Sequence, residues 1–164
     1  MDNIQFSPHF SLNELLASNT ATTKGFTEQW TPNEDVVNSL KVLAIKVLEP
    51  IRELINAPIN ISSGYRCKAL NKAVGGEPTS QHVLGEAADI TTPNLTVANL
   101  YQTIKTSKIE FDELIIETDE KGAWWVHVSY NSKGNQRGLC LKGVLQPNGG
   151  TLCVSDGYGS FRNN

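Results

Sequence analysis

The sequence has little of several things, and each shortage excludes a class of protein. Its 164 residues carry a formal net charge of −3, without the basic excess that marks a nucleic-acid-binding surface, so nucleic acid is not an expected partner. No apolar run is long enough to span a bilayer, and residues 1–5 have neither the basic nor the apolar region of a secretion signal. We therefore expect synthesis in the cytoplasm and no membrane partner.

Cysteine is also scarce. The three cysteines, Cys67, Cys140 and Cys153, are odd in number and show no CxxC spacing, which argues against a thiolate metal site. Cys140 and Cys153 could pair, although reduced thiols are favoured in a cytoplasmic protein. Both arrangements stay open at the level of the sequence.

What is present describes an ordinary globular domain. Apolar residues make up 39% of the chain and charged residues 19%, which is typical of a protein with one hydrophobic core. No repeat or interdomain linker is visible. At this length we expect one domain spanning residues 1–164, and we expect a monomer.

The N-terminal third is predicted to be mostly helical. Residues 11–14 have the spacing of a capping box and open a short helix, and the polar residues 18–29 are expected to form a loop. Residues 31–34 form a second capping box with Thr31 as the cap, followed by apolar residues at three-to-four spacing as far as Ile55. This pattern predicts a long helix with a kink or break at Pro50.

The rest of the chain mixes strands and helices. The expected strands are residues 59–62, 87–92, 111–118 and 124–130, and the expected helices are residues 67–74 and 96–105. The last two strands flank a polar turn, residues 119–122, and should form a hairpin. The tail from Asn131 has apolar islands at residues 139–141 and 144–145 that could add an edge strand or a cover. These elements predict an α+β fold, a small antiparallel sheet with helices packed on it.

Only three histidines occur, and two of them accompany an aspartate in a run that looks buried. His82 and Asp89 lie in Ser-Gln-His-Val-Leu-Gly-Glu-Ala-Ala-Asp, residues 80–89, and His127 lies in Trp-Val-His-Val, residues 125–128. A buried carboxylate needs a compensating cation or hydrogen bonds. Two imidazoles and one carboxylate are the ligands of a divalent metal site that keeps one position open for water or substrate. The alternative is two hydrogen-bonded histidines and a capping aspartate, which requires three coincidences in one short chain.

Other residues are weaker candidates for the same site. Strand alternation places Trp125 on the same face as His127, where it could form a wall of a substrate cleft or simply pack. Ser80 could hydrogen-bond a ligand histidine or the substrate. His9 is expected to pack or cap. No Gly-x-Ser-x-Gly elbow and no local Cys–His pattern occur, so nucleophilic hydrolysis is unsupported.

The motifs resemble those of a known family. They are Ser-Gly-Tyr-Arg at 63–66, Gly-Gly at 75–76, Ser-Gln-His at 80–82, Gly-Glu-Ala-Ala-Asp-Ile at 85–90 and Trp-Val-His-Val-Ser at 125–129. In this order they closely resemble the M15 zinc peptidases, which include D-alanyl-D-alanine carboxypeptidases, vancomycin-resistance dipeptidases and phage endolysins. The resemblance runs from about residue 10 to residue 130 and leaves residues 131–164 as a C-terminal extension.

The resemblance implies a Hedgehog/DD-peptidase-like fold with one Zn²⁺ held by His82, Asp89 and His127. It also implies that Arg66 approaches the substrate carbonyl or carboxylate beside the metal, a role that suits a planar guanidinium. A mononuclear iron site with two histidines and a carboxylate is a further alternative. It is disfavoured because six residues separate His82 from Asp89, whereas one is usual there.

The general base is where the sequence departs from the family. Many members carry an acid three residues before the final histidine, and this chain has Trp124 there. The best replacement is Glu117, because its strand resembles a Hedgehog strand whose closing glutamate stands beside the zinc. Asp119 and Glu120 on the following turn are alternatives. Glu113 shares the parity of Glu117 but lies roughly 13 Å away along the strand, which argues against it.

The expected function is that of a zinc metallopeptidase that hydrolyses peptidoglycan stem peptides by metal-activated water. Glu117 and Arg66 are the expected catalytic residues, and Arg66, Ser80 and Trp125 the expected substrate contacts. Both carboxypeptidase and endopeptidase activity stay open. The short chain and lack of a signal peptide suggest a phage or prophage enzyme acting on the cell wall. The alternative is a non-catalytic binding module that keeps the metal for structure, as Hedgehog domains do.

Overall fold

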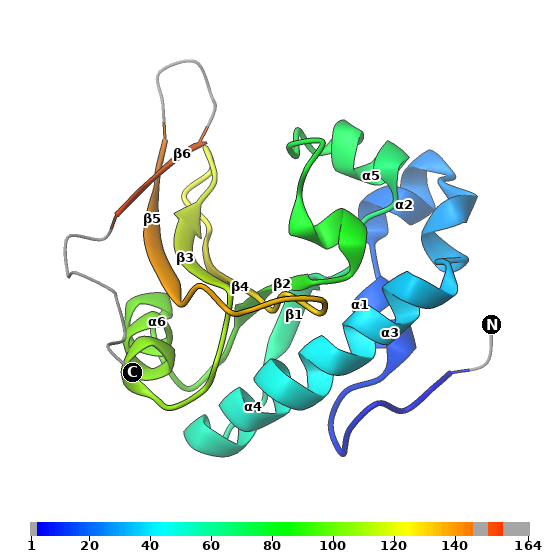
Figure 1. Ribbon diagram of the computed structural model, residues 1–164. Helices are drawn as coiled ribbons and strands as arrows, with labels where there is room; N and C mark the ends of the chain where they lie inside the picture. Colours follow the sequence, from blue (N-terminus) through cyan, green and yellow to red (C-terminus); the bar gives the residue numbers. More distant parts are fainter. Residues whose placement is uncertain (1–2, 146–150, 156–164) are drawn as a thin grey trace.

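The computed structural model describes residues 3–145 and 151–155, which form an α+β domain around one sheet (Figure 1). The strands are β1 (Asn60–Ser63), β2 (Ala87–Thr91), β3 (Glu113–Thr118), β4 (Trp124–Ser129), β5 (Leu139–Leu145) and β6 (Thr151–Ser155). They are arranged in the order β1-β2-β4-β3-β5-β6, and within it only the β3–β5 pair is parallel. The predicted fold class is confirmed, with a sheet that is mostly antiparallel.

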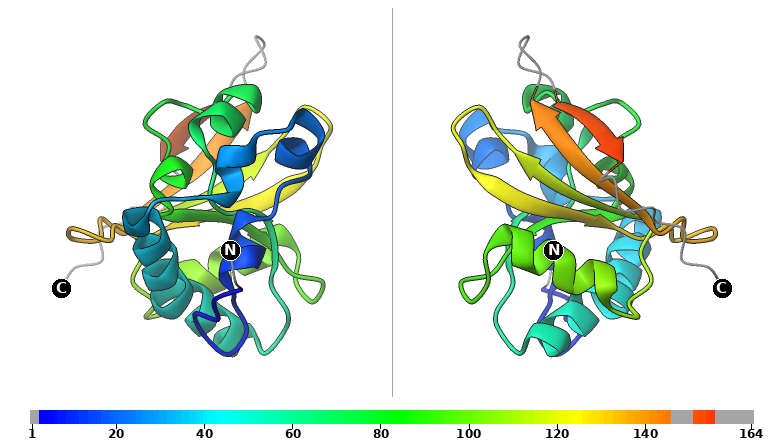
Figure 2. Two further views of the ribbon diagram at one scale, coloured as in Figure 1. Left: turned by 90° about the vertical axis from the view of Figure 1, so that its right-hand side faces the viewer. Right: turned by 90° about the vertical axis from the view of Figure 1, so that its left-hand side faces the viewer.

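Helices lie on both sides of this sheet (Figure 2). The α-helices are α1 (Leu12–Leu16), α2 (Asn19–Lys24), α3 (Glu34–Leu43), α4 (Glu49–Ile55), α5 (Lys68–Ala73) and α6 (Val97–Thr106). Short helices of other types are η1 (Thr27–Trp30), η2 (Ala44–Leu48) and η3 (Gln81–Leu84). Figure 2 shows α4 and α6 on one side of the sheet and α5 on the other. In the described part of the chain, no helix is both long and apolar enough to cross a membrane.

The predicted long helix is present, but its cap differs from the prediction, and of the kink or break predicted at Pro50 the break is absent. Helix α3 is capped by Asn33, whose Oδ1 accepts a hydrogen bond from the backbone N–H of Val36 (2.9 Å), so the prediction of Thr31 as the cap is wrong. Pro50 does not break the helical run. The turns before it, η2, widen to a π-helix, which is one way in which a helix accommodates a residue that has no N–H donor.

The predicted loop at residues 18–29 is wrong, because most of it is helical. Ser18 caps α2 by accepting a hydrogen bond from the N–H of Ala21 (3.1 Å), and Ala21 is buried. Within η1, the buried side-chain amide of Gln29 donates hydrogen bonds to the carbonyls of Leu16 and Tyr65 (both 2.8 Å). A polar sequence thus folds against the domain through caps and one buried amide. At α1, Ser11 occupies the N-cap position without a side-chain capping bond.

One face of the sheet carries the candidate site residues, and the other face packs into the hydrophobic core. Alternation buries the side chains of Ala88, Ile90, Leu114, Val126 and Val128 in the main core with the apolar faces of α3, η2 and α6. The opposite parity carries Asp89 on β2, His127 on β4 and Glu117 on β3. The predicted hairpin of β3 and β4 is confirmed, and Ile115 pairs with His127 in its register.

The tail after Asn131 contributes to the sheet. The two predicted apolar islands fall in a single strand, β5, which pairs with β3, and β6 adds the edge. No disulfide joins the cysteines of the described residues: Cys140 lies in the core, whereas Cys153 is exposed on β6.

Candidate metal centre

Three buried side chains come together at the face of the sheet that is turned away from the hydrophobic core. One ligand atom from each of His82, Asp89 and His127 lies within 4.8 Å of the others. Asp89 Oδ1 is 3.2 Å from His82 Nε2 and 3.0 Å from His127 Nδ1. Ligands bound tetrahedrally to zinc at about 2.0–2.2 Å lie roughly 3.4 Å apart, so this donor set fits a single Zn²⁺. These are the three residues that the sequence analysis selected as metal ligands.

Two of the three candidate ligands owe their positions to the strand ladder. Asp89 on β2 and His127 on β4 are register partners, so their side chains project side by side from the same face. His82 comes instead from η3, a four-residue helix. Its Nδ1 lies 2.7 Å from the carbonyl oxygen of Gly64, so a proton on Nδ1 directs Nε2 toward Asp89.

Gly64 can hold His82 only because it has no side chain. A Cβ on Gly64 would lie 2.3 Å from the carbonyl oxygen of Leu15, on the neighbouring α1. Gly85, at the end of η3, has a φ of +72°, which favours glycine, and packs against Val36. These two glycines allow the His82 segment to approach both the sheet and the helices closely.

The electrostatics keep Asp89 available as an anionic ligand. Burial alone would raise the pKa of Asp89, but His82 and His127 outweigh this effect and hold its pKa well below the ordinary range. Burial would lower the pKa of His127, yet the hydrogen bond and charge of Asp89 raise that pKa above its usual value. Burial lowers the pKa of His82, which favours the neutral imidazole that a metal needs.

Arg66 lies at the same centre. Its Nη2 donates to Asp89 Oδ2 (2.5 Å) and its Nε donates to Ser63 Oγ (2.7 Å). The oxygen that Asp89 offers to Arg66 is therefore not the one it offers to the two histidines. This arrangement orients the carboxylate and places a guanidinium beside the three ligands.

Glu117 lies on β3, the strand that pairs with β4, on which His127 lies. It pairs with Trp125 in the β3–β4 register, and its Oε2 accepts a hydrogen bond from the Trp125 indole Nε1 (2.8 Å). Burial raises the pKa of the Glu117 carboxyl, and His127 and the indole offset this only in part. A raised carboxyl pKa is what a proton-shuttling glutamate needs near neutral pH.

The other acidic candidates are engaged elsewhere. Glu113 and Glu117 lie two residues on either side of Ile115, the partner of His127, so separation along β3 does not discriminate between them. Their partners do, because Glu113 forms an ion pair with Arg137 (2.8 Å). Asp119 accepts hydrogen bonds from two backbone N–H groups of its own turn, and Glu120 is exposed.

Ser80, Trp124 and His9 do not take part in the centre. In the described residues, Ser80 makes no side-chain hydrogen bond to either ligand histidine, and the Gly64 carbonyl holds His82 instead. Trp124 is 44% exposed and has the opposite strand parity to His127, so it does not line the centre. His9 packs against Glu49, with Nδ1 2.5 Å from its carboxylate, as a non-ligand role predicts.

Comparison with known families agrees with this geometry. A family model described as Peptidase M15 matches residues 8–129, which is most of the chain and includes all three ligand residues, Arg66 and Glu117. No curated protein matches the sequence.

Proposed function

The chain belongs to the peptidase M15 family, and we propose that it is a zinc-dependent metallopeptidase acting on peptidoglycan stem peptides. The observation that carries the proposal is the buried cluster of His82, Asp89 and His127 on one face of the sheet. Two imidazoles and one carboxylate leave a coordination position open, which is the arrangement of catalytic zinc sites. Bound Zn²⁺ would supply polarisation of the scissile carbonyl and a lowered pKa for a bound water.

Glu117 is the residue proposed to move the proton. The Trp125 indole donates to Oε2, so the other oxygen, Oε1, is the one proposed to take a proton from the attacking water. The same carboxyl then gives that proton to the amine that leaves. Burial raises the pKa of this carboxyl, which brings it closer to neutral pH and so suits both acceptance and release of a proton.

Arg66 and Trp125 are proposed to position the substrate. The Nη2 and Nε groups of Arg66 are held by Asp89 and Ser63, which fixes the plane of the guanidinium and leaves Nη1 to meet a substrate carbonyl or carboxylate. Trp125 is fixed by Glu117 and presents its ring on the face that carries His127. We propose Ser80 as a substrate contact at the entrance of η3.

The peptidoglycan substrate and the setting are inferred from the family resemblance. D-alanyl-D-alanine carboxypeptidase and endopeptidase activity are both consistent with this centre. We propose that the chain acts as a monomer on the cell wall, as a phage or prophage enzyme does.

Digestion of purified peptidoglycan tests the proposal, with the released muropeptides identified by mass spectrometry. We expect new peptide termini with the wild type and their loss with a chelator or with Glu117→Gln. The exposed Glu120→Gln variant is the matched control and should cleave normally. Wild-type cleavage that persists in the chelator would contradict zinc dependence, and the masses of the products identify the bond that is cut.

A non-catalytic module is the second candidate, favoured by one observation. Trp124, which stands where many family members carry an acid, is exposed and turned away from the centre. In such a module His127→Ala would lower thermal stability while Glu117→Ala would change neither stability nor biological role. Loss of cleavage by Glu117→Ala with an unchanged unfolding temperature would exclude it.

A further inference from the structure

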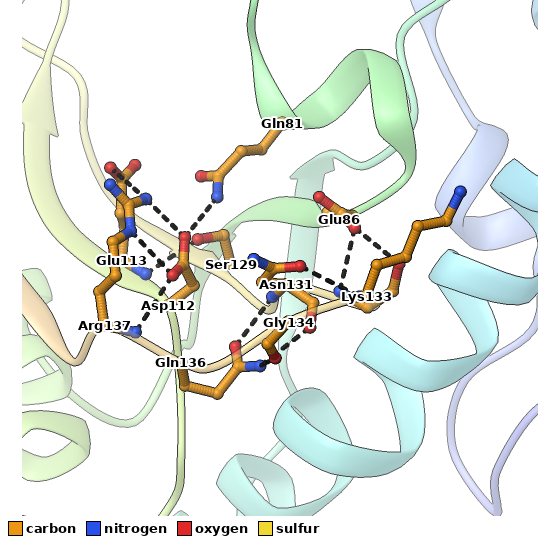
Figure 3. A network of polar contacts seen from close by, with 11 residues as sticks. Gln81, Glu86, Asp112, Glu113, Ser129, Asn131, Lys133, Gly134, Gln136 and Arg137 are labelled. Carbon is orange, nitrogen blue, oxygen red and sulfur yellow. Dashed lines mark hydrogen bonds and ion pairs between the residues drawn. The ribbon is translucent and has the colours of Figure 1, made fainter.

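A second buried carboxylate lies close to the metal centre without belonging to it. Asp112 is 2% exposed and immediately precedes β3. Its Oδ1 accepts hydrogen bonds from Arg137 N (3.1 Å) and Nε (2.9 Å), and its Oδ2 accepts from Arg137 Nη2 (2.5 Å) and from Gln81 Nε2 (2.8 Å). Figure 3 shows these contacts converging on the one carboxylate. A buried carboxylate with four donors is a fixed point of the structure.

The four hydrogen bonds join three segments of the chain. Gln81 directly precedes the ligand His82 on η3, Asp112 leads into β3, and Arg137 belongs to the segment 130–138 that follows β4. The contact therefore ties the His82 segment to the strand that carries Glu117.

The segment 130–138 also holds the other end of η3. Glu86 Oε1 accepts hydrogen bonds from Ser132 N (3.0 Å) and Oγ (2.6 Å), and the Glu86 carbonyl accepts one from Tyr130 N (2.9 Å) (Figure 3 shows the Glu86 side chain). The backbone of Gly138 is hydrogen-bonded to Phe111 (3.0 Å). Segment 130–138 is therefore bonded directly to Glu86, just after η3, and through Asp112 to Gln81, at the start of η3.

His82 is the ligand that needs such a brace. Asp89 and His127 are fixed by the strand ladder, whereas η3 is a single 3₁₀ turn with little stability of its own. The carbonyl of Gly64 orients the His82 ring but does not hold η3 against β3.

We propose that Asp112 and Arg137 are positioning residues for the metal centre, acting on His82 through Gln81. Arg137 lies beyond residues 8–129, the part matched by the family model, so the C-terminal extension of this chain completes the support of a ligand. The inference rests on the zinc site proposed above and not on the choice of substrate.

Gln81→Ala is the sharpest variant, because it cuts the link to η3 while leaving the buried Asp112–Arg137 ion pair intact. Arg137→Ala removes the guanidinium that holds Asp112 and leaves this buried carboxylate without a charged partner, so Arg137→Lys accompanies it. Lys133→Ala is the matched control for the arginine, because it also removes a cation from segment 130–138. The Lys133 side chain forms an exposed ion pair with Asp35 (3.9 Å). Gln102→Ala, on the exposed face of α6, is the control for Gln81.

The measurement is zinc affinity, by competition of the metal-free proteins with a chromogenic chelator, together with their thermal unfolding midpoints. Groups hydrogen-bonded to a ligand typically contribute about 10–100-fold to metal affinity. Gln81 and Arg137 bond to Asp112 and act one contact further from the metal, so we expect losses of about tenfold, at the lower end of this range, for Gln81→Ala and Arg137→Ala. Arg137→Lys should restore part of the affinity, and both controls should match the wild type.

A purely structural role gives a different result. If Gln81→Ala binds zinc as tightly as Gln102→Ala, the inference is overturned, whatever happens to stability in the arginine variants. If Arg137→Ala does not fold, Gln81→Ala alone decides. A wild-type chain that binds no zinc would overturn both this inference and the proposed function, whereas tight binding by the wild type and by Gln81→Ala overturns only the inference.

Discussion

The hydrogen bond between Trp125 and Glu117 makes a quantitative prediction about the pH dependence of catalysis. The indole Nε1 donates to Glu117 Oε2 at 2.8 Å, and this bond favours the ionised carboxylate. Trp125→Phe keeps an aromatic ring on the strand and removes the N–H donor. The pKa of Glu117, already raised by burial, should rise further in this variant.

The size of the shift follows from the strength of the bond. A hydrogen bond to a charged group contributes roughly 1.5–3 kcal/mol, and the lower end applies because Glu117 is only partly buried. Loss of a bond that favours the ionised form raises the Glu117 pKa further above its usual value. A base works only when it is ionised, so the acidic limb of the rate profile moves to higher pH, and kcat/KM at a fixed pH on that limb should fall by roughly tenfold, which corresponds to about 1.4 kcal/mol.

The assay is kcat/KM for cleavage of a stem peptide by zinc-loaded protein between pH 4 and pH 9, with the zinc content measured at each pH. Trp124→Phe is the control, because Trp124 lies on the same strand with the opposite parity and 44% exposure. An acidic limb of Trp125→Phe that coincides with the control, or moves to lower pH, refutes Glu117 as the base.

Three further predictions follow from packing and charge. Gly64→Ala places a Cβ 2.3 Å from the Leu15 carbonyl oxygen, so both the unfolding temperature and zinc affinity should fall, as measured by calorimetry and chelator competition. Burial alone would raise the pKa of Asp112, but hydrogen bonds from Arg137 outweigh it and lower that pKa. The ionised carboxylate therefore adds its full contribution to the free energy of unfolding above about pH 3.9, and this contribution is lost as pH falls through the pKa of the folded state. Urea unfolding of metal-free protein should therefore show the gap between wild type and Asp112→Asn narrowing from pH 6 to pH 3. Leu40→Ala, at a fully buried site, should cost about 2–5 kcal/mol in the same assay, while Ile45→Ala, at an exposed one, should cost far less.

The parts of the fold that the sequence predicted are those governed by local periodicity. Alternation in the strands placed His127 on the face opposite the core, and apolar spacing located the helical run from α3 to α4. Asp89 was recognisable because a carboxylate in an apolar run requires a partner. Local patterns carry this information because each strand and helix repeats its own geometry.

The parts that were missed depend on contacts between distant segments. Gly64 holds His82 through a backbone carbonyl, which has no signature in side-chain chemistry. The helix α2 is polar in sequence, and its one buried residue, Ala21, packs with Cys67 and Leu70 from a distant segment. The following η1 is held in the same way, by the buried amide of Gln29. The bond from Gln81 to Asp112 spans 31 residues and depends on the whole sheet being in place. Only the folded chain brings these groups together.

Titration of zinc into chelator-stripped protein, with stem-peptide cleavage measured at each addition, tests the central claim that His82, Asp89 and His127 hold one catalytic zinc. The rate should rise in proportion to bound zinc and level off at one zinc per chain, and Asp89→Ala should show neither tight binding nor cleavage. Full activity in the stripped wild type, or in Asp89→Ala, would contradict the claim.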